Sequence, residues 1–284
     1  MENILIIKKN ARDLFFDRHN NIESYFSCTE KNILFKICKK LKIPLNIFFG
    51  KWKKNIHKYD IVILFDNGYN YQISRYIKKK NKKIKIIFWY WNSLVEYKNK
   101  LIDDTNIDEI WTYNRFDAEK YGINYNPQFY DYVKKTENKE VKYDVVFMGR
   151  SKGRKEELLK LQNKFEEKSL TTNFNIIENE KNIIDYNLYL EKVLESKCIL
   201  DYSISKKCGL SLRPLEALFF EKKLITNNID IVNYKFYNKN NIFILGVDDL
   251  EEIEYFFHCE YKPIEPQIIN YYSFEMWKER FCRS

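Results

Sequence analysis

The chain has 284 residues and a formal net charge of +9, and 17% of its residues are aromatic. This length suits one large domain or two of about 130 residues each, and the aromatic content argues against a disordered chain. No apolar stretch approaches the roughly 20 residues that a membrane-spanning helix needs. The six cysteines form no C-x-x-C pair, and no secretory leader is expected, so the simplest interpretation is free thiols in a reducing cytoplasm.

The basic surplus lies in the first half of the chain. Residues 1–140 contain 27 basic and 17 acidic side chains, whereas residues 141–284 contain 22 and 23. Within residues 31–85 there are 16 basic and 2 acidic residues. This run is a solvated surface or a basic face that meets anionic lipid head groups or a lipid-pyrophosphate acceptor. A nucleic-acid partner is not expected, because the run is poor in arginine and glycine and has no recognisable stacking platform.

The first half of the chain has the alternation of a parallel α/β domain. Apolar runs alternate with amphipathic stretches, which indicates βαβ units, and the runs are apolar on both faces, as in a sheet covered on both sides. The expected strands are Ile4–Ile7, Leu45–Phe48, Ile61–Phe65, Ile84–Trp89 and Glu109–Thr112. The expected helices are residues 22–41, 71–80 and 115–121.

A polar segment without periodicity, residues 131–142, is the expected linker between two domains. The alternation then begins again, with expected strands at Asp144–Met148, Phe174–Ile177, Cys198–Asp201, Leu224–Thr226 and Asn241–Leu245. The expected helices are residues 155–168, 183–195, 212–220, 248–257 and 273–282. The predicted organisation is an acceptor-side domain over residues 1–130, a donor domain over residues 143–265 and a helical tail over residues 266–284.

The segment 208–226 has the most informative pattern in the chain. A small-residue turn at Gly209 leads into a short helix that contains Arg213 and Glu216, and the strand Leu224–Thr226 follows. In a parallel α/β domain this arrangement brings backbone N–H groups, a guanidinium and a carboxylate to the carboxyl ends of the strands. Phosphate binds N–H groups and arginine, and carboxylates accept hydrogen bonds from sugar hydroxyls. The segment therefore predicts a site for phosphate and ribose.

The same segment resembles the donor-site signature of GT-B glycosyltransferases, roughly E-G-F-G-x-x-x-x-E-A-M-A-x-G-x-P-V-I. Gly209 matches the first glycine, residues 216–218 match E-A-M, and residues 224–225 match V-I. Cys208 stands where retaining members have the first glutamate, and Ser211 replaces the second glycine. The resemblance implies two Rossmann-like domains that face each other across a cleft, with a C-terminal helix that crosses back to the N-terminal domain.

Glycines and cations follow the strand Asp144–Met148, in a stretch that resembles the loop GT-B enzymes use for the diphosphate. Glycines allow a tight turn, and fixed cations stabilise the charge of a departing phosphate without a metal. The resemblance implies a donor site of Gly149, Arg150, Lys152, Arg154, Gly209, Ser211, Arg213, Glu216 and Thr226. Within it, Glu216 is expected to bind the ribose, Arg213 to bind the diphosphate, and Arg150 also to assist catalysis.

The acceptor side is expected at the strand ends of the first half. Asp66 and Asn67 end one strand, and Trp89, Trp91 and Asn92 end the next. Aromatic faces stack on sugar rings or cover lipid chains, although core packing explains the tryptophans equally well.

A catalytic base must accept the proton of the acceptor hydroxyl, and a carboxylate or histidine in a cleft does this. Asp17 and His19 follow the first strand, where GT-B enzymes often have acceptor-side groups. The sequence leaves the choice open among Asp17, His19, Asp66 and Glu96. Asp66 is the first preference and Asp17 the second.

No metal site or cofactor is expected. The three histidines are scattered, and no Cys/His ligand spacing occurs. The chain also has no P-loop, no nucleophile elbow and no dinucleotide-binding G-x-G-x-x-G. The only small molecule implied by the resemblance, besides the acceptor, is a nucleoside diphosphate sugar as substrate.

The resemblance implies a metal-independent hexosyltransferase of bacterial capsule, lipopolysaccharide or exopolysaccharide synthesis. It would move a hexose, with a UDP-sugar as first expectation, to a hydroxyl of a saccharide or lipid-linked saccharide. The expected location is the cytoplasm, with the basic run 31–85 as a candidate peripheral contact to the inner face of the plasma membrane. Two alternatives stay open: a non-catalytic GT-B-like subunit, which the cysteine at position 208 favours, and a nucleic-acid-binding protein.

Overall fold

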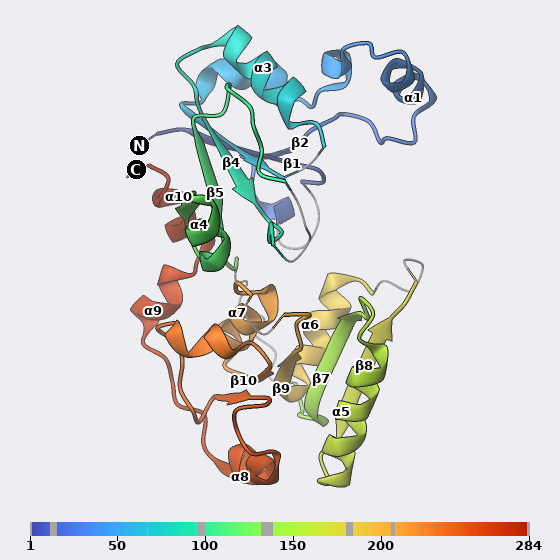
Figure 1. Ribbon diagram of the computed structural model, residues 1–284, viewed down its shortest axis with the longest axis vertical. Helices are drawn as coiled ribbons and strands as arrows, with labels where there is room; N and C mark the ends of the chain where they lie inside the picture. Colours follow the sequence, from blue (N-terminus) through green and yellow to red (C-terminus); the bar gives the residue numbers. More distant parts are fainter. Residues whose placement is uncertain are drawn as a thin grey trace. The chain divides into compact units, whose positions relative to one another are not determined.

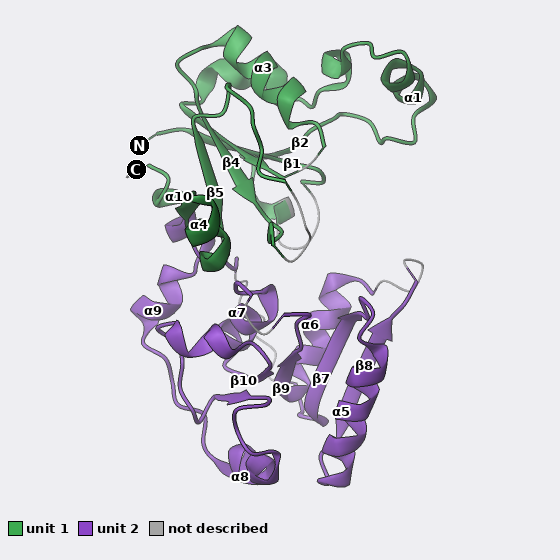
Figure 2. Cartoon of the chain, viewed as in Figure 1, with its two compact units in different colours: residues 1–126, 278–284 green, residues 127–277 purple. Residues whose placement is uncertain are grey.

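The computed structural model describes residues 2–11, 16–66, 68–95, 100–131, 139–179, 184–205 and 208–282. The chain divides into two compact units, which are shown in Figure 2. Unit 1 comprises residues 1–126 and 278–284, and unit 2 comprises residues 127–277. The end of the chain therefore belongs to the unit in which the chain begins, which confirms the predicted return of the C-terminal tail.

Unit 1 is built on a parallel sheet that, within the described ranges, has the strand order β2-β1-β3-β4-β5-β6 (Figure 1). The strands are β1 (Ile4–Lys8), β2 (Ile22–Ser24), β3 (Ile61–Phe65), β4 (Lys85–Tyr90), β5 (Glu109–Thr112) and β6 (Asn124–Tyr125). The chain first adds β2 on one side of β1 and then adds β3 to β6 on the other side. This reversal between β1 and β3 is a topological switch point, beside which ligands bind in open α/β sheets.

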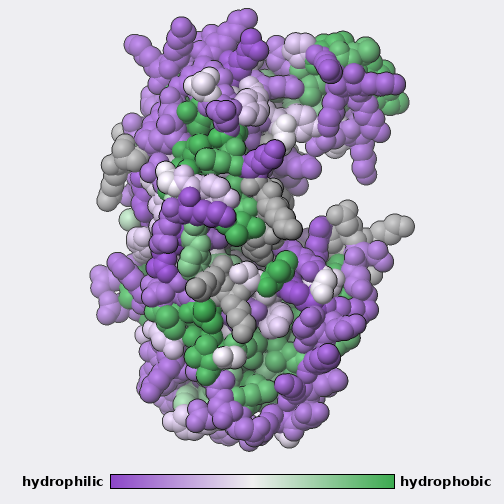
Figure 3. Space-filling view, viewed as in Figure 1, coloured by the Kyte–Doolittle hydropathy of each residue, from purple (hydrophilic) through white to green (hydrophobic). Residues whose placement is uncertain are grey.

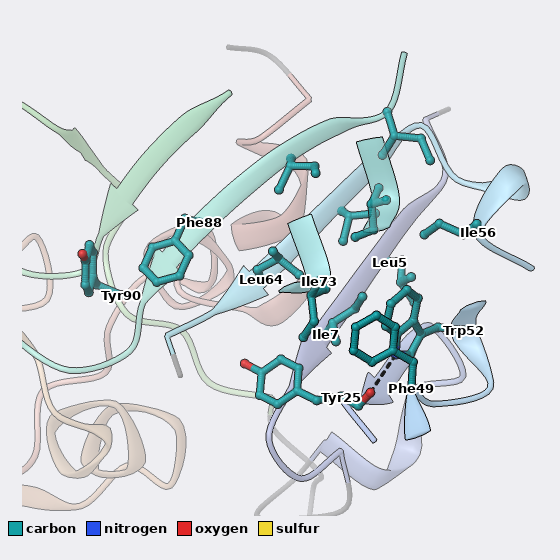
Figure 4. Packing of buried hydrophobic residues seen from close by; sticks show 14 of the residues in the cluster. Leu5, Ile7, Tyr25, Phe49, Trp52, Ile56, Leu64, Ile73, Phe88 and Tyr90 are labelled. Carbon is teal, nitrogen blue, oxygen red and sulfur yellow. Dashed lines mark hydrogen bonds between the residues drawn. The ribbon is translucent and has the colours of Figure 1, made fainter. Parts of the chain in front are cut away.

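The core of unit 1 lies between this sheet and the helices that cover it. The helices are α1 (Ile33–Lys40), α2 (Trp52–Asn55), α3 (Asn70–Lys80) and α4 (Arg115–Tyr121). Ile73 and Ile77 of α3 are one turn apart, so they share a face and both are fully buried. Figure 4 shows Leu5 and Leu64 of the sheet in the same cluster as Ile73 and Trp52.

Two predicted elements of unit 1 are wrong. The expected strand Leu45–Phe48 is a 3-10 helix, η2; it follows Pro44, and a short apolar run does not by itself distinguish a strand from a helix. The expected helix 22–41 is the edge strand β2 followed by α1. Helix α1 begins only at Ile33, because the Asn32 side chain accepts a hydrogen bond from the backbone N–H of Phe35 (3.2 Å) and caps the helix there.

Unit 2 repeats the architecture with the strand order β11-β10-β9-β7-β8, again all parallel. Its strands are β7 (Tyr143–Arg150), β8 (Thr172–Ile177), β9 (Ser196–Asp201), β10 (Lys223–Thr226) and β11 (Ile242–Ile244). Its helices are α5 (Lys155–Glu167), α6 (Tyr186–Leu194), α7 (Leu212–Phe219), α8 (Ile253–His258) and α9 (Pro266–Tyr271). The expected strands and the helices up to α8 are present, with shifted ends. The switch point of this sheet lies between β7 and β9.

The tail is held by aromatic side chains. Helix α10 (Phe274–Glu279) buries Trp277, whose ring lies 4.2 Å from that of Phe129 within unit 2. Phe281 packs edge-on against Trp89 and Trp111 within unit 1, at centroid distances of 6.0 and 5.0 Å. The predicted linker falls mostly on residues 132–138, which lie outside the described residues.

Candidate functional site

In unit 2, the loops after β7 and β9 lie next to each other, because these two strands pair across the switch point. Arg154 joins the two loops: its Nη1 donates to the Tyr202 carbonyl, and its Nε donates to the Ser151 carbonyl (3.0 Å). Asn227, which follows β10, holds Ser203 through two hydrogen bonds, from Nδ2 to the Ser203 carbonyl (2.8 Å) and from the Ser203 N–H to Oδ1 (2.7 Å). Hydrogen bonds thus link the segments that follow β7, β9 and β10 at the carboxyl edge of this sheet.

Arg213 extends from the first turn of α7 onto the end of β7. Its Nη2 donates to the Met148 carbonyl (2.8 Å), and its guanidinium lies over the Phe147 ring, 5.1 Å from the centroid. A Cβ atom on residue 149 would overlap with Nη2, so the glycine at this position allows the cation to lie there. The Arg213 Nε is buried and has no hydrogen-bond acceptor within the described part of the chain.

Asp201 ends β9 and is only 2% exposed. Its Oδ1 accepts from the Ser211 hydroxyl (2.8 Å) and lies 3.7 Å from Nη1 of Arg213, and its Oδ2 accepts from the Thr226 hydroxyl (3.3 Å). Ser211 is also the N-cap of α7, since its hydroxyl accepts from the Arg213 N–H (3.3 Å). Asp201 therefore orients both the cap of α7 and the guanidinium beside it.

Glu216 lies in the interior of unit 2, with an exposed fraction of 2%. Two tyrosines of α6 donate to its carboxylate, Tyr186 to Oε1 (2.7 Å) and Tyr189 to Oε2 (2.5 Å), and the Tyr130 hydroxyl lies 3.0 Å from that of Tyr186. Burial raises the pKa of Glu216, while the two tyrosine hydrogen bonds and the charge of Arg213 act in the opposite direction. Burial together with the Glu216 charge raises the pKa of both tyrosines.

The remaining predicted donor residues lie at strand ends of the same sheet or in the segments that follow them. Arg150 and Lys152 are exposed at the end of β7 and in the turn after it. The turn has left-handed backbone at Lys152 (φ 47°) and Gly153 (φ 81°). Gly209 is buried in the segment before α7. Thr226, fully buried at the end of β10, accepts from the Asn228 N–H (3.1 Å) in addition to its bond with Asp201.

In unit 1, Asp66 follows β3 directly. Its Oδ1 accepts from the Trp91 N–H (3.0 Å) and its Oδ2 from the Asn92 side-chain amide (3.2 Å). Burial raises the pKa of Asp66, and the hydrogen bonds from Asn92 and Trp91 lower it. The ends of two adjacent strands, β3 and β4, are therefore joined through this carboxylate.

A pocket of about 710 Å³ opens beside Asp66 within unit 1. Its lining comes from the ends of β3 and β4, the start of α3 and the segment that begins at Lys100. Tyr90 is part of this lining, and burial raises its pKa to about 12, so its hydroxyl is neutral at physiological pH. The complete lining is Asp66, Gly68, Asn70, Tyr71, Phe88, Tyr90, Asn92, Lys100, Leu101 and Ile102. Acid, amide, hydroxyl and aromatic groups in one concave surface are the groups that bind saccharides.

The two predicted acceptor tryptophans differ in environment. Trp89 is fully buried in the sheet. Trp91 is partly exposed and stacks on Phe65 at a centroid distance of 5.4 Å. His19, in the turn after the 3-10 helix η1 (Phe16–Arg18), is also partly exposed. The side chain of Asp17 and the residues Asn67 and Glu96 lie outside the described residues.

The described residues contain no group of three or more His, Cys, Asp or Glu side chains arranged to hold a metal ion. Among the same residues, no helix is both long and apolar enough to cross a membrane.

No protein-family model and no curated protein matches this chain. Solved structures do resemble it. The apo form of the lipopolysaccharide outer core galactosyltransferase WaaB is 14% identical, with a TM-score of 0.53, over 96% of this chain and 86% of that one. An α1,3-fucosyltransferase with GDP is 11% identical, with a TM-score of 0.48, over 99% of this chain and 90% of that one. The fold is of the GT-B type.

In this GT-B fold the two predicted donor motifs, 149–154 and 208–226, come together at the carboxyl edge of the second sheet. Arg213 is the side chain that joins them. Asp201 is not among the residues predicted from the sequence, although an aspartate at the end of an apolar strand is the same pattern that pointed to Asp66. Nothing in the sequence marked Tyr186 and Tyr189 as partners of Glu216, because that contact depends on how α6 packs against α7.

Proposed function

We propose that this protein is a glycosyltransferase, which moves a sugar from a nucleoside diphosphate sugar to a hydroxyl of a saccharide. The observation that supports this most strongly is the position of Arg213 across Gly149, at the switch point of the second sheet. Open α/β sheets bind their ligands there, and a fixed guanidinium beside a helix N-terminus suits an anionic diphosphate.

The donor would bind with its diphosphate between the loop after β7 and the first turn of α7. Arg213 already has its guanidinium held by Asp201 and the Met148 carbonyl, so little side-chain ordering is needed when phosphate binds. Arg150 and Lys152 are exposed on the adjacent loop and would neutralise the charge that develops on the leaving diphosphate. This arrangement would not need a metal ion.

Glu216 is our candidate for the ribose. Because Glu216 is only 2% exposed and a tyrosine lies against each of its carboxylate oxygens, a ribose hydroxyl would reach the carboxylate by displacing one of the two tyrosine hydroxyls. Such an exchange conserves the number of hydrogen bonds to the carboxylate, so it does not leave Glu216 unsatisfied.

Asp66 is our candidate for the catalytic base, at the edge of the pocket in unit 1. Its environment suits this role, since burial gives the carboxylate a higher affinity for protons and two hydrogen bonds keep its orientation fixed. Trp91 and Asn92 would then contact the acceptor.

For the sugar, the donor and the acceptor, we propose transfer of a hexose from a UDP-sugar to a saccharide or lipid-linked saccharide in bacterial surface polysaccharide synthesis. Support comes from the resemblance of the segment 208–226 to the GT-B donor signature and from the name of the WaaB structure, an enzyme of the lipopolysaccharide outer core. A non-catalytic GT-B-like subunit is the second candidate, because a buried cysteine, Cys208, stands at the position of the first signature glutamate.

The first experiment is calorimetric titration with UDP, GDP and CDP of the wild type, Arg213→Ala and Arg75→Ala. Arg75 is an exposed residue of α3 in unit 1 and controls for the loss of one positive charge. We expect one nucleotide to bind selectively, about tenfold to a hundredfold more weakly in Arg213→Ala, and equally well in Arg75→Ala. Binding with no sugar transfer from the matching donor would favour the non-catalytic subunit. No binding of any nucleotide would contradict the proposed glycosyltransferase and would also favour the non-catalytic subunit.

A further inference from the structure

Helix α1 and the residues after it present large apolar side chains to solvent. Ile33, Leu34 and Leu41 are 74, 65 and 63% exposed. We call these three residues, together with Ile37, Ile43 and Ile47, the α1 surface; all six are exposed. Figure 3 shows a hydrophobic area over α1 and the neighbouring turn. A soluble domain does not normally expose so many large apolar residues in one short segment, and such areas mark contact surfaces.

The apolar side chains of α1 are on the face that points away from the core. Ile33, Ile37 and Leu41 follow each other at intervals of four residues, so they share one face of the helix. The opposite face is anchored by Phe35, which is fully buried and packs edge-on against Phe26 at 4.8 Å. Phe35 is thus the buried residue of the helix, and Lys39 adds a polar contact to unit 1, because its Nζ donates to the Tyr69 hydroxyl (2.9 Å). The apolar face of Ile33, Ile37 and Leu41 is left uncovered in the described structure.

Positive charge surrounds the α1 surface. From Lys31 to Tyr59 the chain contains nine lysines and no aspartate or glutamate. Lys36 and Lys40 are exposed, and each lies three residues after an isoleucine of the apolar face, so these cations flank that face. An apolar area with cations beside it is complementary to a lipid bilayer that has an apolar interior and anionic head groups.

We propose that the α1 surface docks on an anionic lipid bilayer. The isoleucine and leucine side chains would enter the boundary between head groups and acyl chains, while the flanking lysines contact lipid phosphates. A second copy of the chain is a poorer occupant, because a symmetric contact through this face would bring two lysine clusters together. This inference goes beyond the proposed function and does not depend on it.

The test is co-sedimentation of the full chain with vesicles of phosphatidylcholine, with and without phosphatidylglycerol. The variants are Leu34→Ser/Leu41→Ser, which removes apolar area, and Lys36→Glu/Lys40→Glu, which reverses charge. The matched control, Leu159→Ser/Val247→Ser, changes two exposed apolar residues of unit 2. All substituted residues are exposed, so each variant is expected to keep the wild-type melting temperature.

We expect binding to the vesicles that contain phosphatidylglycerol, and a loss of affinity of about tenfold or more in both α1 variants. The control should bind as the wild type does. Absence of vesicle binding, or an equal loss in the control, would overturn the proposal. So would a wild-type dimer in solution that Leu34→Ser/Leu41→Ser converts to a monomer. Nucleotide titration of the same variants reports on unit 2 separately, so failure here and failure of the proposed function give different results.

Discussion

The guanidinium of Arg213 occupies the space that a side chain on residue 149 would need. It donates to the Met148 carbonyl across 65 residues of sequence, and Asp201 lies 3.7 Å away on its other side. A glycine, an arginine and an aspartate from three different segments thus meet at one point, where Arg213 supplies the positive charge. This arrangement is the structural basis for the proposed diphosphate site.

Gly149→Ala should move Arg213 without unfolding the protein. The added methyl group meets the end of a flexible side chain, so the melting temperature should change little. Nucleotide affinity should fall by about tenfold, because the guanidinium can no longer lie against β7. Calorimetry checks this, with Gly68→Ala as control, where an added Cβ meets no atom within 4 Å. Unchanged affinity in Gly149→Ala would exclude Arg213 in its present position as a phosphate ligand.

Glu216→Gln should change how stability depends on pH. The raised pKa of Glu216 means that the folded state holds this proton more tightly than the unfolded chain does. The wild-type free energy of unfolding therefore loses a contribution as the pH rises from the ordinary value of 4.5 through the raised pKa. The glutamine side chain does not titrate in this pH range, so the variant lacks this contribution.

Denaturant titrations of both proteins between about pH 4 and pH 8 test this dependence. The advantage of the wild type over Glu216→Gln should be greatest in acid and should shrink towards neutral pH. Glu156→Gln, an exposed site on α5, is the control. A difference that stays constant with pH would show that the proton on Glu216 does not contribute.

Asp66→Asn should abolish most turnover while donor binding stays intact. If Asp66 is the base, its loss should lower the rate by about a hundredfold to ten-thousandfold. Steady-state rates and calorimetry on the same preparation separate the two effects. A normal rate in Asp66→Asn together with a large loss in Asp17→Asn would transfer the role to Asp17.

Asn92→Ala should shift the pH profile of the reaction. The Asn92 amide donates to Asp66 and lowers its pKa. Without this hydrogen bond the carboxylate should stay protonated to a higher pH, so the acidic limb of kcat/KM should move upward. The measurement is kcat/KM against pH for the wild type and the variant. If the acidic limb does not move, the group whose ionisation controls the rate is not Asp66.

Phe281→Ala should destabilise unit 1. Phe281 is fully buried and contacts Trp89 and Trp111 edge-on. Removing a buried phenylalanine side chain typically costs about 3–5 kcal/mol. Denaturation followed by tryptophan fluorescence should show this loss, whereas the exposed neighbour Cys282, changed to serine, should have little effect. Equal losses in both variants would mean that the aromatic contact is not the cause.

Much of the fold could be predicted because the strands are strongly patterned. β3, β9 and β10 contain short apolar runs between polar segments. Such runs are buried in a parallel sheet, because helices cover both of its faces. Prediction failed at Leu45–Phe48, where four residues are too few for periodicity to decide between a strand and a 3-10 helix.

The sequence by itself determined the α/β class, the two-unit organisation and the two motifs around Gly149 and Arg213, because all of these depend on local pattern. Only the tertiary structure decided which side chains meet. It brought Arg213 onto Gly149 and Tyr186 and Tyr189 onto Glu216, and it left the apolar face of α1 uncovered. These contacts depend on how separate helices and strands pack. The local hydrophobic pattern of a segment shows which face is buried, but it does not identify the distant segment that packs against that face.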